Sequence, residues 1–312
     1  MNETTGRILQ QVNSVVIGKG EITEKVLMAV LAQGHVLLED VPGVGKTTMA
    51  LAFARTLGLD SRRVQFTSDT MPSDIIGFSV YNKDTGAFDF KSGAVMTNLL
   101  LADEINRTSS KTQSALLEAM EEYQVTVDGQ TYPLPEPFVV LATQNPVGSA
   151  GTQLLPSSQL DRFMIRTTMG YPDRQSQLEI LRERHHENPL DRLEGVVTRE
   201  ELLQLTEQAR QVHIAESIYD YIVELVSATR SNEYIDLGIS PRGALALCRM
   251  AKAHGFVRGR DFVTPEDIYE VFDAVCAHRL VLSAKARLGK LTAEEITCRI
   301  REQVAVPQVA AL

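Results

Sequence analysis

The stretch Glu39–Thr48, which reads EDVPGVGKTT, decides how this sequence is interpreted. An apolar run, HVLLE at 35–39, precedes it, and a helical pattern over Thr47–Leu57 follows. Glycines allow the main chain to approach an anion closely, and amide groups at a helix start can point toward it. Lys46 can reach the β- and γ-phosphates of a nucleotide, and the Thr47 hydroxyl can join a Mg²⁺ shell. We therefore expect a phosphate-binding loop. Its expected nucleotide contacts are Pro42, Gly43, Val44, Gly45, Lys46, Thr47 and Thr48.

This loop departs from the usual pattern G-x-x-x-x-G-K-[ST] at one position. The pattern calls for glycine at 40, and the sequence has Asp40. The first glycine is the member of the pattern least engaged with phosphate, so the expectation of anion binding stands. The competing interpretation is an ordinary glycine-rich turn that carries a lysine by chance. A strand pattern before the loop and a helix pattern after it disfavour that interpretation.

Short apolar runs alternate with helical patterns in the first part of the chain. Runs of this length, bounded by turn residues, are typical of strands buried on both faces. Helical patterns such as Ser110–Glu122 lie between most of them. The alternation predicts an α/β fold with a five-stranded parallel sheet and helices on both faces. The expected strands are His35–Asp40, Arg63–Thr67, Asn98–Asp103, Phe138–Thr143 and Met164–Met169.

Two carboxylates follow the third expected strand, in the run LLLADE at 99–104. An open α/β sheet binds ligands at the carboxyl ends of its strands. Asp103 is therefore expected to hold Mg²⁺, through water, and Glu104 to orient and activate the attacking water. On its own, such a run equally describes a strand that ends at solvent. Its position after a phosphate loop favours the functional interpretation.

Two polar insertions interrupt the alternation. Phe78–Phe90 alternates aromatic and polar residues around Asp84-Thr85-Gly86, and Val125–Leu134 has Asp128-Gly129 between two strand-like runs. Both patterns predict β-hairpins that project from the α/β core.

Helical spacing dominates from about residue 173 onward. We expect two domains: a nucleotide-binding core over 1–172 and a small all-helical lid over 173–312. The expected helices of the lid are Gln175–His186, Thr198–Gln211, Glu216–Ser231, Pro241–His254, Pro265–His278 and Thr292–Val304.

Composition excludes several classes of protein. The net charge is −9, and both 1–170 and 171–312 are acidic, which disfavours a mainly electrostatic nucleic-acid binder or a polybasic membrane anchor. The three cysteines form no CxxC pair, so a metal framework or disulfide scaffold is not expected. No apolar run is long enough to span a bilayer, and no secretory leader is apparent. We expect a cytoplasmic protein without membrane insertion.

Taken in order, these motifs resemble the MoxR family of AAA+ ATPases, in the helix-2-insert group. The resemblance covers nearly the whole chain. It also accounts for Asp40, since the family shares that residue type there, and for the two hairpins. The segments that carry it are LLEDVPGVGKT, LLLADEINR, VLATQNP, LPSSQLDRF and GISPRG.

The resemblance implies roles for residues outside the phosphate loop. Asn145 resembles sensor 1, which aligns the water and reads the γ-phosphate; without this context it would be a turn residue before proline. Ile17 and Gly18 resemble the segment that packs on adenine.

Three arginines are implied to act on nucleotide or to compete for that role. Arg162, in LDRF, resembles an arginine finger that acts on the neighbouring subunit's ATP. Arg166 is the competing candidate, and a surface salt bridge is the alternative role for Arg162. Arg242 resembles sensor 2, and whether it acts in cis or in trans stays open.

The implied function is Mg²⁺-dependent ATP hydrolysis in a homo-oligomeric, hexameric ring. The ring would act as a chaperone-like remodeller of a client or adaptor protein, such as one with a von Willebrand A domain or a metal cofactor. The alternatives are a nucleic-acid-translocating motor and a nucleotide-gated scaffold with little turnover. The acidic charge and the few hairpin cations, Lys83 and Lys91, weigh against a motor. The complete set of expected catalytic residues weighs against a scaffold.

Overall fold

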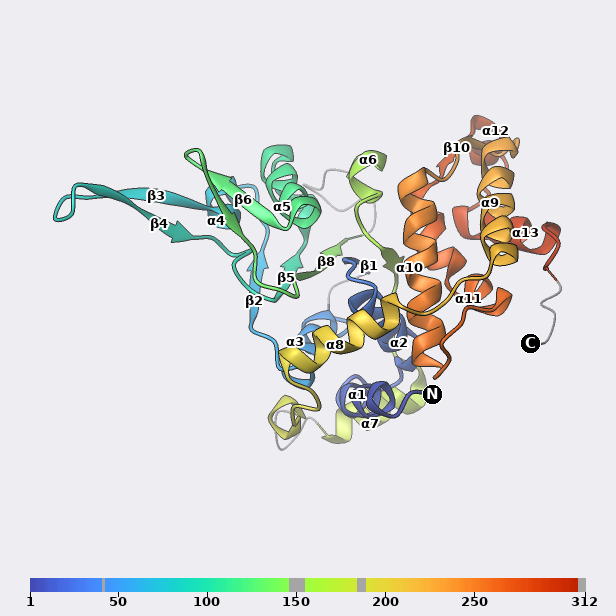
Figure 1. The fold of residues 1–312 in the computed structure, drawn as a ribbon, viewed down its shortest axis with the longest axis horizontal. Coiled ribbons are helices and arrows are strands. Elements are labelled where there is room, and N and C mark those ends of the chain that lie inside the picture. Colours follow the sequence, from blue (N-terminus) through green and yellow to red (C-terminus); the bar gives the residue numbers. More distant parts are fainter. Residues whose placement is uncertain (41–42, 146–154, 184–188, 308–312) are drawn as a thin grey trace.

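The computed structural model describes residues 1–40, 43–145, 155–183 and 189–307 (Figure 1). Its centre is a five-stranded parallel sheet with the strand order β2-β5-β8-β1-β9. The α/β class and all five expected strands are therefore confirmed. The strands are β1 (Val36–Glu39), β2 (Ser61–Gln65), β5 (Leu99–Asp103), β8 (Val139–Gln144) and β9 (Ile165–Thr167).

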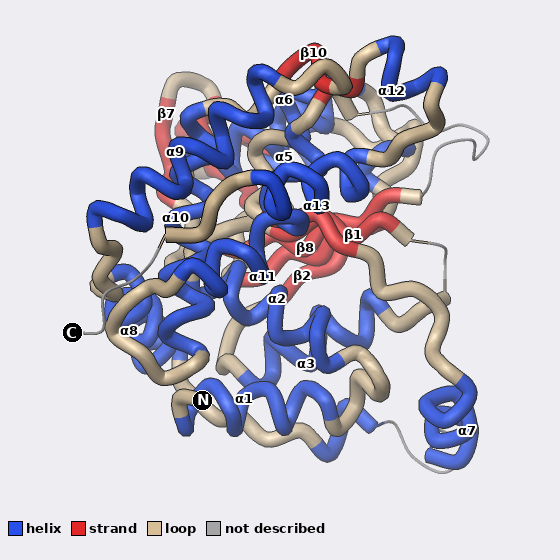
Figure 2. The backbone as a smooth tube through the Cα atoms, turned by 90° about the vertical axis from the view of Figure 1, so that its right-hand side faces the viewer, coloured by secondary structure: helices blue, strands red, loops and turns tan. Residues whose placement is uncertain are grey.

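Alternate residues of the three central strands, β5, β8 and β1, enter different hydrophobic layers. Leu38 on β1 packs in one cluster with Ile8, Val26 and Phe53, whereas Leu37 packs in another with Leu116. The sheet therefore has helices on both faces, as Figure 2 shows. On one side lie α1 (Glu3–Asn13), α2 (Gly20–Leu31) and α3 (Lys46–Thr56), and on the other α4 (Pro72–Ile76) and α5 (Ser110–Glu122).

The parallel sheet separates the chain's functional segments between two edges. The carboxyl ends of β1, β5 and β8 meet at one edge, which carries the phosphate loop, Asp103-Glu104 and Asn145. The segments that enter the strands lie at the opposite edge. Among these are His35 before β1 and Asp161–Phe163 before β9, and the C-terminal end of α5 lies beside them.

Both expected hairpins are present. The first pairs β3 (Gly77–Asn82) with β4 (Ala87–Ser92), and the second pairs β6 (Gln124–Val127) with β7 (Gln130–Pro133). The β3–β4 hairpin extends far from the sheet in Figure 1. Phe90 on β4 stacks on Tyr132 on β7, with ring centroids 4.0 Å apart and planes at 10°. The two hairpins are therefore joined at their bases by an aromatic pair.

The C-terminal part is helical, with one difference from the expectation. β10 (Ile235–Leu237) and β11 (Val281–Leu282) form a small antiparallel pair, so an all-helical description is wrong in this detail. Strands of this length are too short to produce a readable alternation. The remaining helices are α6 (Ser157–Leu160), α7 (Arg174–Glu183), α8 (Arg199–Arg210), α9 (Glu216–Ser231), α10 (Pro241–Val257), α11 (Pro265–Cys276), α12 (Ala284–Leu288) and α13 (Ala293–Gln303). Short 3₁₀ turns occupy Ile105–Arg107, Pro189–Arg192 and Ala277–Arg279.

One hydrophobic cluster runs through both parts of the chain. It joins Leu27 of α2 to Leu202 of α8 and Leu247 of α10. The helices α8 and α10 therefore pack on α2, and the expected division at residue 172 stays a prediction. Within the described ranges, no helix is long and apolar enough to cross a membrane.

Candidate nucleotide site

The phosphate loop leads directly into α3. Gly43 and Gly45 have φ of 86° and 99°, in the left-handed region where glycine is favoured. Lys46 is buried, and its Nζ donates to the main-chain oxygen of Asp40 at 2.9 Å. Burial lowers the pKa of Lys46, and the carboxylates of Asp40, Asp103 and Glu104 oppose that shift. The ammonium is thus held at the loop by an acceptor that a phosphate can replace.

The other expected loop contacts differ in how far the structure describes them. Thr47 and Thr48 lie in the first turn of α3, and Val44 packs against the core. The Thr47 hydroxyl makes no hydrogen bond within the described part of the chain. Pro42 lies outside the described residues.

Asp103 is buried at the carboxyl end of β5, and both of its oxygens have protein partners. Oδ2 accepts a hydrogen bond from Arg63 Nε at 2.7 Å, and Oδ1 accepts one from the Thr143 hydroxyl at 3.3 Å. Thr143 also accepts from the Glu104 main-chain N–H at 2.9 Å. This threonine on the neighbouring strand therefore fixes both carboxylate residues.

Glu104 has a left-handed backbone, with φ of 57°, and its side chain has two donors. Arg107 Nη1 donates to Oε2 at 2.8 Å, and Asn145 Nδ2 donates to Oε1 at 3.2 Å. The hydrogen bond from Arg107 lowers the pKa of Glu104; burial opposes this, and the bond from Asn145 adds to it. The carboxylate is therefore held ionised and oriented.

Asn145 follows β8 and faces Glu104. Its main chain is fixed by Asn106, whose Oδ1 accepts from Asn145 N–H at 3.4 Å and whose Nδ2 donates to Asn145 O at 3.2 Å. The Asn145 Oδ1 atom is buried and has no hydrogen-bond partner among the residues that the structure describes. A buried acceptor without a partner is costly, so a donor such as a water molecule belongs beside it.

Ile17 and Gly18 lie next to the start of α7. Gly18 has φ of 72°, and a Cβ at this position would meet the Ser176 hydroxyl oxygen at 2.1 Å. Only glycine fits so close an approach. Lys19 then donates to the main-chain oxygens of Met169 and Tyr171 at 2.5 and 3.0 Å.

These groups fit a nucleotide with Mg²⁺. The loop offers a buried ammonium and main-chain amides, Thr47 offers a hydroxyl, and Asp103 offers a carboxylate. The described residues contain no cluster of three His, Cys, Asp or Glu that could hold a metal ion. One carboxylate and one hydroxyl, completed by phosphate oxygens and water, suit Mg²⁺ rather than an all-protein metal site.

Arg162 and Arg242 meet at the opposite edge of the sheet. Both pair with Glu121 near the end of α5: Arg162 Nε lies 2.8 Å from Oε2, and Arg242 Nη2 contacts Oε1. They line a cavity of about 410 Å³ together with Arg249. The structure brings the two predicted arginines together, away from their own phosphate loop.

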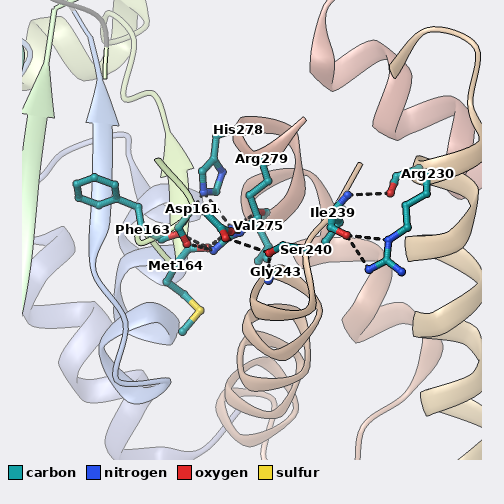
Figure 3. A network of polar contacts seen from close by, with 11 residues as sticks. Asp161, Phe163, Met164, Arg230, Ile239, Ser240, Gly243, Val275, His278 and Arg279 are labelled. Atoms are coloured by element: carbon teal, nitrogen blue, oxygen red, sulfur yellow. Dashed lines mark hydrogen bonds and ion pairs between the residues drawn. The ribbon is translucent and has the colours of Figure 1, made fainter. Parts of the chain in front are cut away.

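A buried network holds the segment that carries Arg162 (Figure 3). Arg279 is almost fully buried, and its Nε donates to Asp161 Oδ1 at 2.8 Å. Its Nη2 donates to Phe163 O at 2.7 Å. The Ser240 hydroxyl, which caps α10, donates to Asp161 Oδ2 at 3.0 Å. Asp161 thus ties the segment before β9 to the start of the helix that carries Arg242.

Arg166, the competing candidate, has a different environment. It lies on β9, where Nη2 is 2.7 Å from Glu294 Oε1 and Nη1 is 3.5 Å from Glu39 Oε2. Two carboxylates of its own chain therefore hold it, one on each side. Glu121 of the same chain holds Arg162 in a similar way, so the choice between Arg162 and Arg166 as the finger stays a prediction.

Several residues of the site were not expected from sequence. Thr143 could have been found, since it ends the strand beside Asp103. Asn106 could also have been found, since it lies in the quoted segment LLLADEINR. Glu121 and Arg279 carry no local signal, because each acts on a segment distant in sequence.

Comparison with known proteins identifies relatives of both parts of the chain. Residues 35–165 match the model of the ATPase family associated with various cellular activities (AAA), and 227–299 match the AAA lid domain. YeaC of Bacillus subtilis is 47% identical, over 97% of this chain and 94% of its own. Chaperone MoxR1 of Mycobacterium tuberculosis is 40% identical, over 99% and 84%. A crystal structure assigned as an ATPase from Cytophaga hutchinsonii has a TM-score of 0.90 and 40% identity, covering 98% of this chain and 95% of its own.

Proposed function

Because this chain belongs to the MoxR family of AAA ATPases, we propose that it hydrolyses Mg²⁺-bound ATP at the boundary between subunits of a ring. The observation that carries the proposal is the convergence of Lys46, Glu104 and Asn145 at one sheet edge, where Glu104 and Asn145 are hydrogen-bonded. Positioning and charge stabilisation are what phosphoryl transfer requires of a protein.

Each group at this edge has one task. Lys46 and the loop amides bind the phosphates. Mg²⁺, held by Thr47 and Asp103, would supply positive charge to the phosphate oxygens. Glu104 and Asn145 would orient the attacking water from two sides, and Glu104 would accept its proton. The lowered pKa of Glu104 ensures that the carboxylate is ionised when water binds.

Arg162 and Arg242 would act in trans. A parallel strand of five residues separates the two sheet edges by about 16 Å, farther than an arginine side chain reaches. Since both arginines lie at the edge opposite their own loop, the ATP within their reach belongs to a neighbour. A heterologous contact of this kind closes into a ring when the rotation permits, and a hexamer is our proposal.

Subunit mixing tests this arrangement. Arg162→Ala subunits keep their own loop and should bind ATP, yet adding them to active subunits should depress turnover more than dilution does. Arg166→Ala is the matched control. Turnover of its mixtures with active subunits should equal the weighted average of the turnover of the two proteins. An additive result for Arg162→Ala would remove the trans assignment.

The work done by the ATP cycle is proposed to be remodelling or activation of a partner protein in the cytoplasm. The β3–β4 hairpin exposes Phe78, Tyr81 and Phe88, the last 72% exposed, and such aromatic side chains suit contact with protein. A relative over almost the whole chain is named a chaperone. A client with a von Willebrand A domain or a metal cofactor site is the class that we propose to test first.

A nucleic-acid motor is the second candidate, and its support is weaker. The net charge is −9, and the long hairpin offers only Lys83 and Lys91 as cations. Turnover stimulated by DNA or RNA, with a steep dependence on salt, would favour the motor. Absence of phosphate release would favour a nucleotide-gated scaffold instead.

A further inference from the structure

Asp40 occupies the position where the phosphate-loop pattern has its first glycine, and its side chain is buried. One oxygen of the carboxylate is bound to the main chain of a distant segment. Asp40 Oδ2 accepts hydrogen bonds from the main-chain N–H groups of Met169, at 2.5 Å, and Gly170, at 2.7 Å. These residues follow β9, where the chain leaves the sheet toward α7.

The strand register explains this geometry. β1 and β9 pair in parallel, and Leu38 lies opposite Thr167, so Asp40 comes level with Met169 two residues later. β9 is the edge strand, and its main-chain ladder to β1 ends at this point. The Asp40 carboxylate supplies the acceptor that the ladder no longer provides. A glycine, which has no side chain, would leave both N–H groups without it.

The main chain of Asp40 also contacts the edge of the sheet that carries the phosphate loop and Asn145, which we call the catalytic edge. Its carbonyl oxygen accepts from Lys46 Nζ at 2.9 Å, and its N–H donates to the main-chain oxygen of Gln144, just before Asn145. One residue thus joins the phosphate-binding lysine, the strand that leads to Asn145, and the segment that exits the sheet.

A second side chain holds the same exit segment. Lys19, next to Gly18, donates to the carbonyl oxygens of Met169 and Tyr171. The N–H groups of the segment are therefore bound by an anion and its carbonyl groups by a cation. Both ions belong to segments expected to touch nucleotide, one on the phosphate side and one on the adenine side.

We propose that Asp40 is a positioning residue that transmits the state of the phosphate loop to the exit segment Met169–Tyr171, and so to the helices that follow. A bound phosphate competes with the Asp40 carbonyl for the Lys46 ammonium. The loss of that hydrogen bond changes the position of Asp40, and its carboxylate carries the change to Met169 and Gly170. Aspartate in place of the usual glycine therefore couples the phosphate loop to the exit segment.

The discriminating variant is Asp40→Gly, which restores the usual pattern. Asp40→Asn is the conservative variant, since one amide oxygen can accept both hydrogen bonds that Oδ2 accepts now. Ser283→Ala is the matched control: that serine also makes two main-chain hydrogen bonds, to Ala286 and Glu233, far from the loop. All variants are made in the full chain.

Hydrogen exchange of the 167–172 backbone, with and without Mg²⁺-ADP, is the first measurement. Asp40→Gly should exchange about tenfold faster or more in this segment, the range for losing hydrogen bonds to a charged acceptor. Nucleotide should alter exchange here in the wild type and in Asp40→Asn, and much less in Asp40→Gly. The proposal is overturned if Asp40→Gly responds like the wild type, or if Asp40→Asn fails as Asp40→Gly does.

Kinetics supply the second measurement, which rests on the proposed function. Asp40→Gly should lose kcat about tenfold while its affinity for Mg²⁺-ADP changes less than threefold. If Asp40→Gly does not fold, Lys19→Met tests the same segment and should also speed its exchange; unchanged exchange would overturn the proposal. Failure of ATP hydrolysis in the wild type would leave the exchange results intact, so the two failures are distinguishable.

Discussion

Asn145 Nδ2 lies 3.2 Å from Glu104 Oε1 and donates a hydrogen bond to it across the carboxyl ends of two adjacent strands. In the proposed mechanism, this hydrogen bond orients the Glu104 carboxylate that would accept a proton from the attacking water. The side-chain oxygen of Asn145, Oδ1, is buried and accepts no hydrogen bond from the described residues, so it can accept one from the same water.

Replacing Glu104 with glutamine should separate binding from hydrolysis. Glu104→Gln keeps the shape of the side chain and loses the proton acceptor, so turnover should fall about 100- to 10,000-fold. Binding of Mg²⁺-ATP should be unchanged, because phosphate contacts come from the loop. Phosphate release and equilibrium binding, measured on the same preparation, check this. Near-normal turnover would remove Glu104 from its proposed role.

The acid limit of turnover should depend on Arg107. The pKa of Glu104 lies below its ordinary value, chiefly because Arg107 donates to it. The active form is ionised, so its fraction falls only as pH drops through this lowered pKa. Any loss of turnover that protonation of Glu104 causes should therefore begin below the ordinary titration range of a glutamate. In Arg107→Gln the acid limb of kcat against pH should move to higher pH. An unchanged acid limb would mean that a group other than Glu104 determines the loss of kcat at low pH.

Loss of the Phe90–Tyr132 stack should loosen the long hairpin. Tyr132→Ala removes an aromatic pair worth about 0.5–1.5 kcal/mol. Hydrogen exchange in β3 and β4 should speed up, while basal ATP turnover stays within twofold, because neither residue touches the catalytic edge. Phe88→Ala at the exposed end is the control and should leave exchange at the hairpin base unchanged. Equal increases of hydrogen exchange in the two variants would argue against the view that the Phe90–Tyr132 stack holds the two hairpins together.

The helical part depends on a buried charge at Asp267. This carboxylate is fully buried and accepts from Arg260 at 2.6 and 2.7 Å and from the Thr264 N–H at 2.7 Å; it also contacts His254. Burial alone would raise the pKa of Asp267, but the hydrogen bonds from His254 and Arg260 prevail and hold it well below its ordinary value. Asp267→Ala should destabilise the chain by about 3–5 kcal/mol, since it removes the buried partner of the ion pair with half-buried Arg260 and of the contact with buried His254. Denaturant unfolding measures this, with exposed Glu233→Gln as an unaffected control.

The sign of the pH dependence follows from the lowered pKa. Stability from Asp267 is fully present above the carboxylate's unfolded pKa of about 3.9 and is lost as pH falls toward the folded value. The difference in unfolding free energy between wild type and Asp267→Asn should therefore shrink at acid pH. A constant difference from pH 7 to pH 3 would contradict this linkage.

The sheet and the catalytic edge were predictable because their signals are local. Each buried strand is a short apolar run, and Lys46, Asp103 and Asn145 each follow such a run within a few residues. A parallel sheet then brings these ends together without further information. The helices α1 and α2 lie outside the sequence-based expectation, although α1 has an amphipathic pattern.

The arrangement of the arginines could not be predicted in the same way. Arg162 and Arg242 are 80 residues apart, and they meet at Glu121, which no motif marks. The role of Asp40 was also hidden, since its partners Met169 and Gly170 lie about 130 residues later. Contacts of this kind follow from packing of whole elements, which a local pattern does not encode.

Titration calorimetry with Mg²⁺-ADP tests the central claim most directly, because every later step requires the loop to hold a nucleotide. The wild-type chain should bind one nucleotide per subunit. Lys46→Ala should bind at least about tenfold more weakly, since it loses a charge-assisted contact to phosphate. No binding by the folded wild type, or equal affinity in Lys46→Ala, would contradict the account.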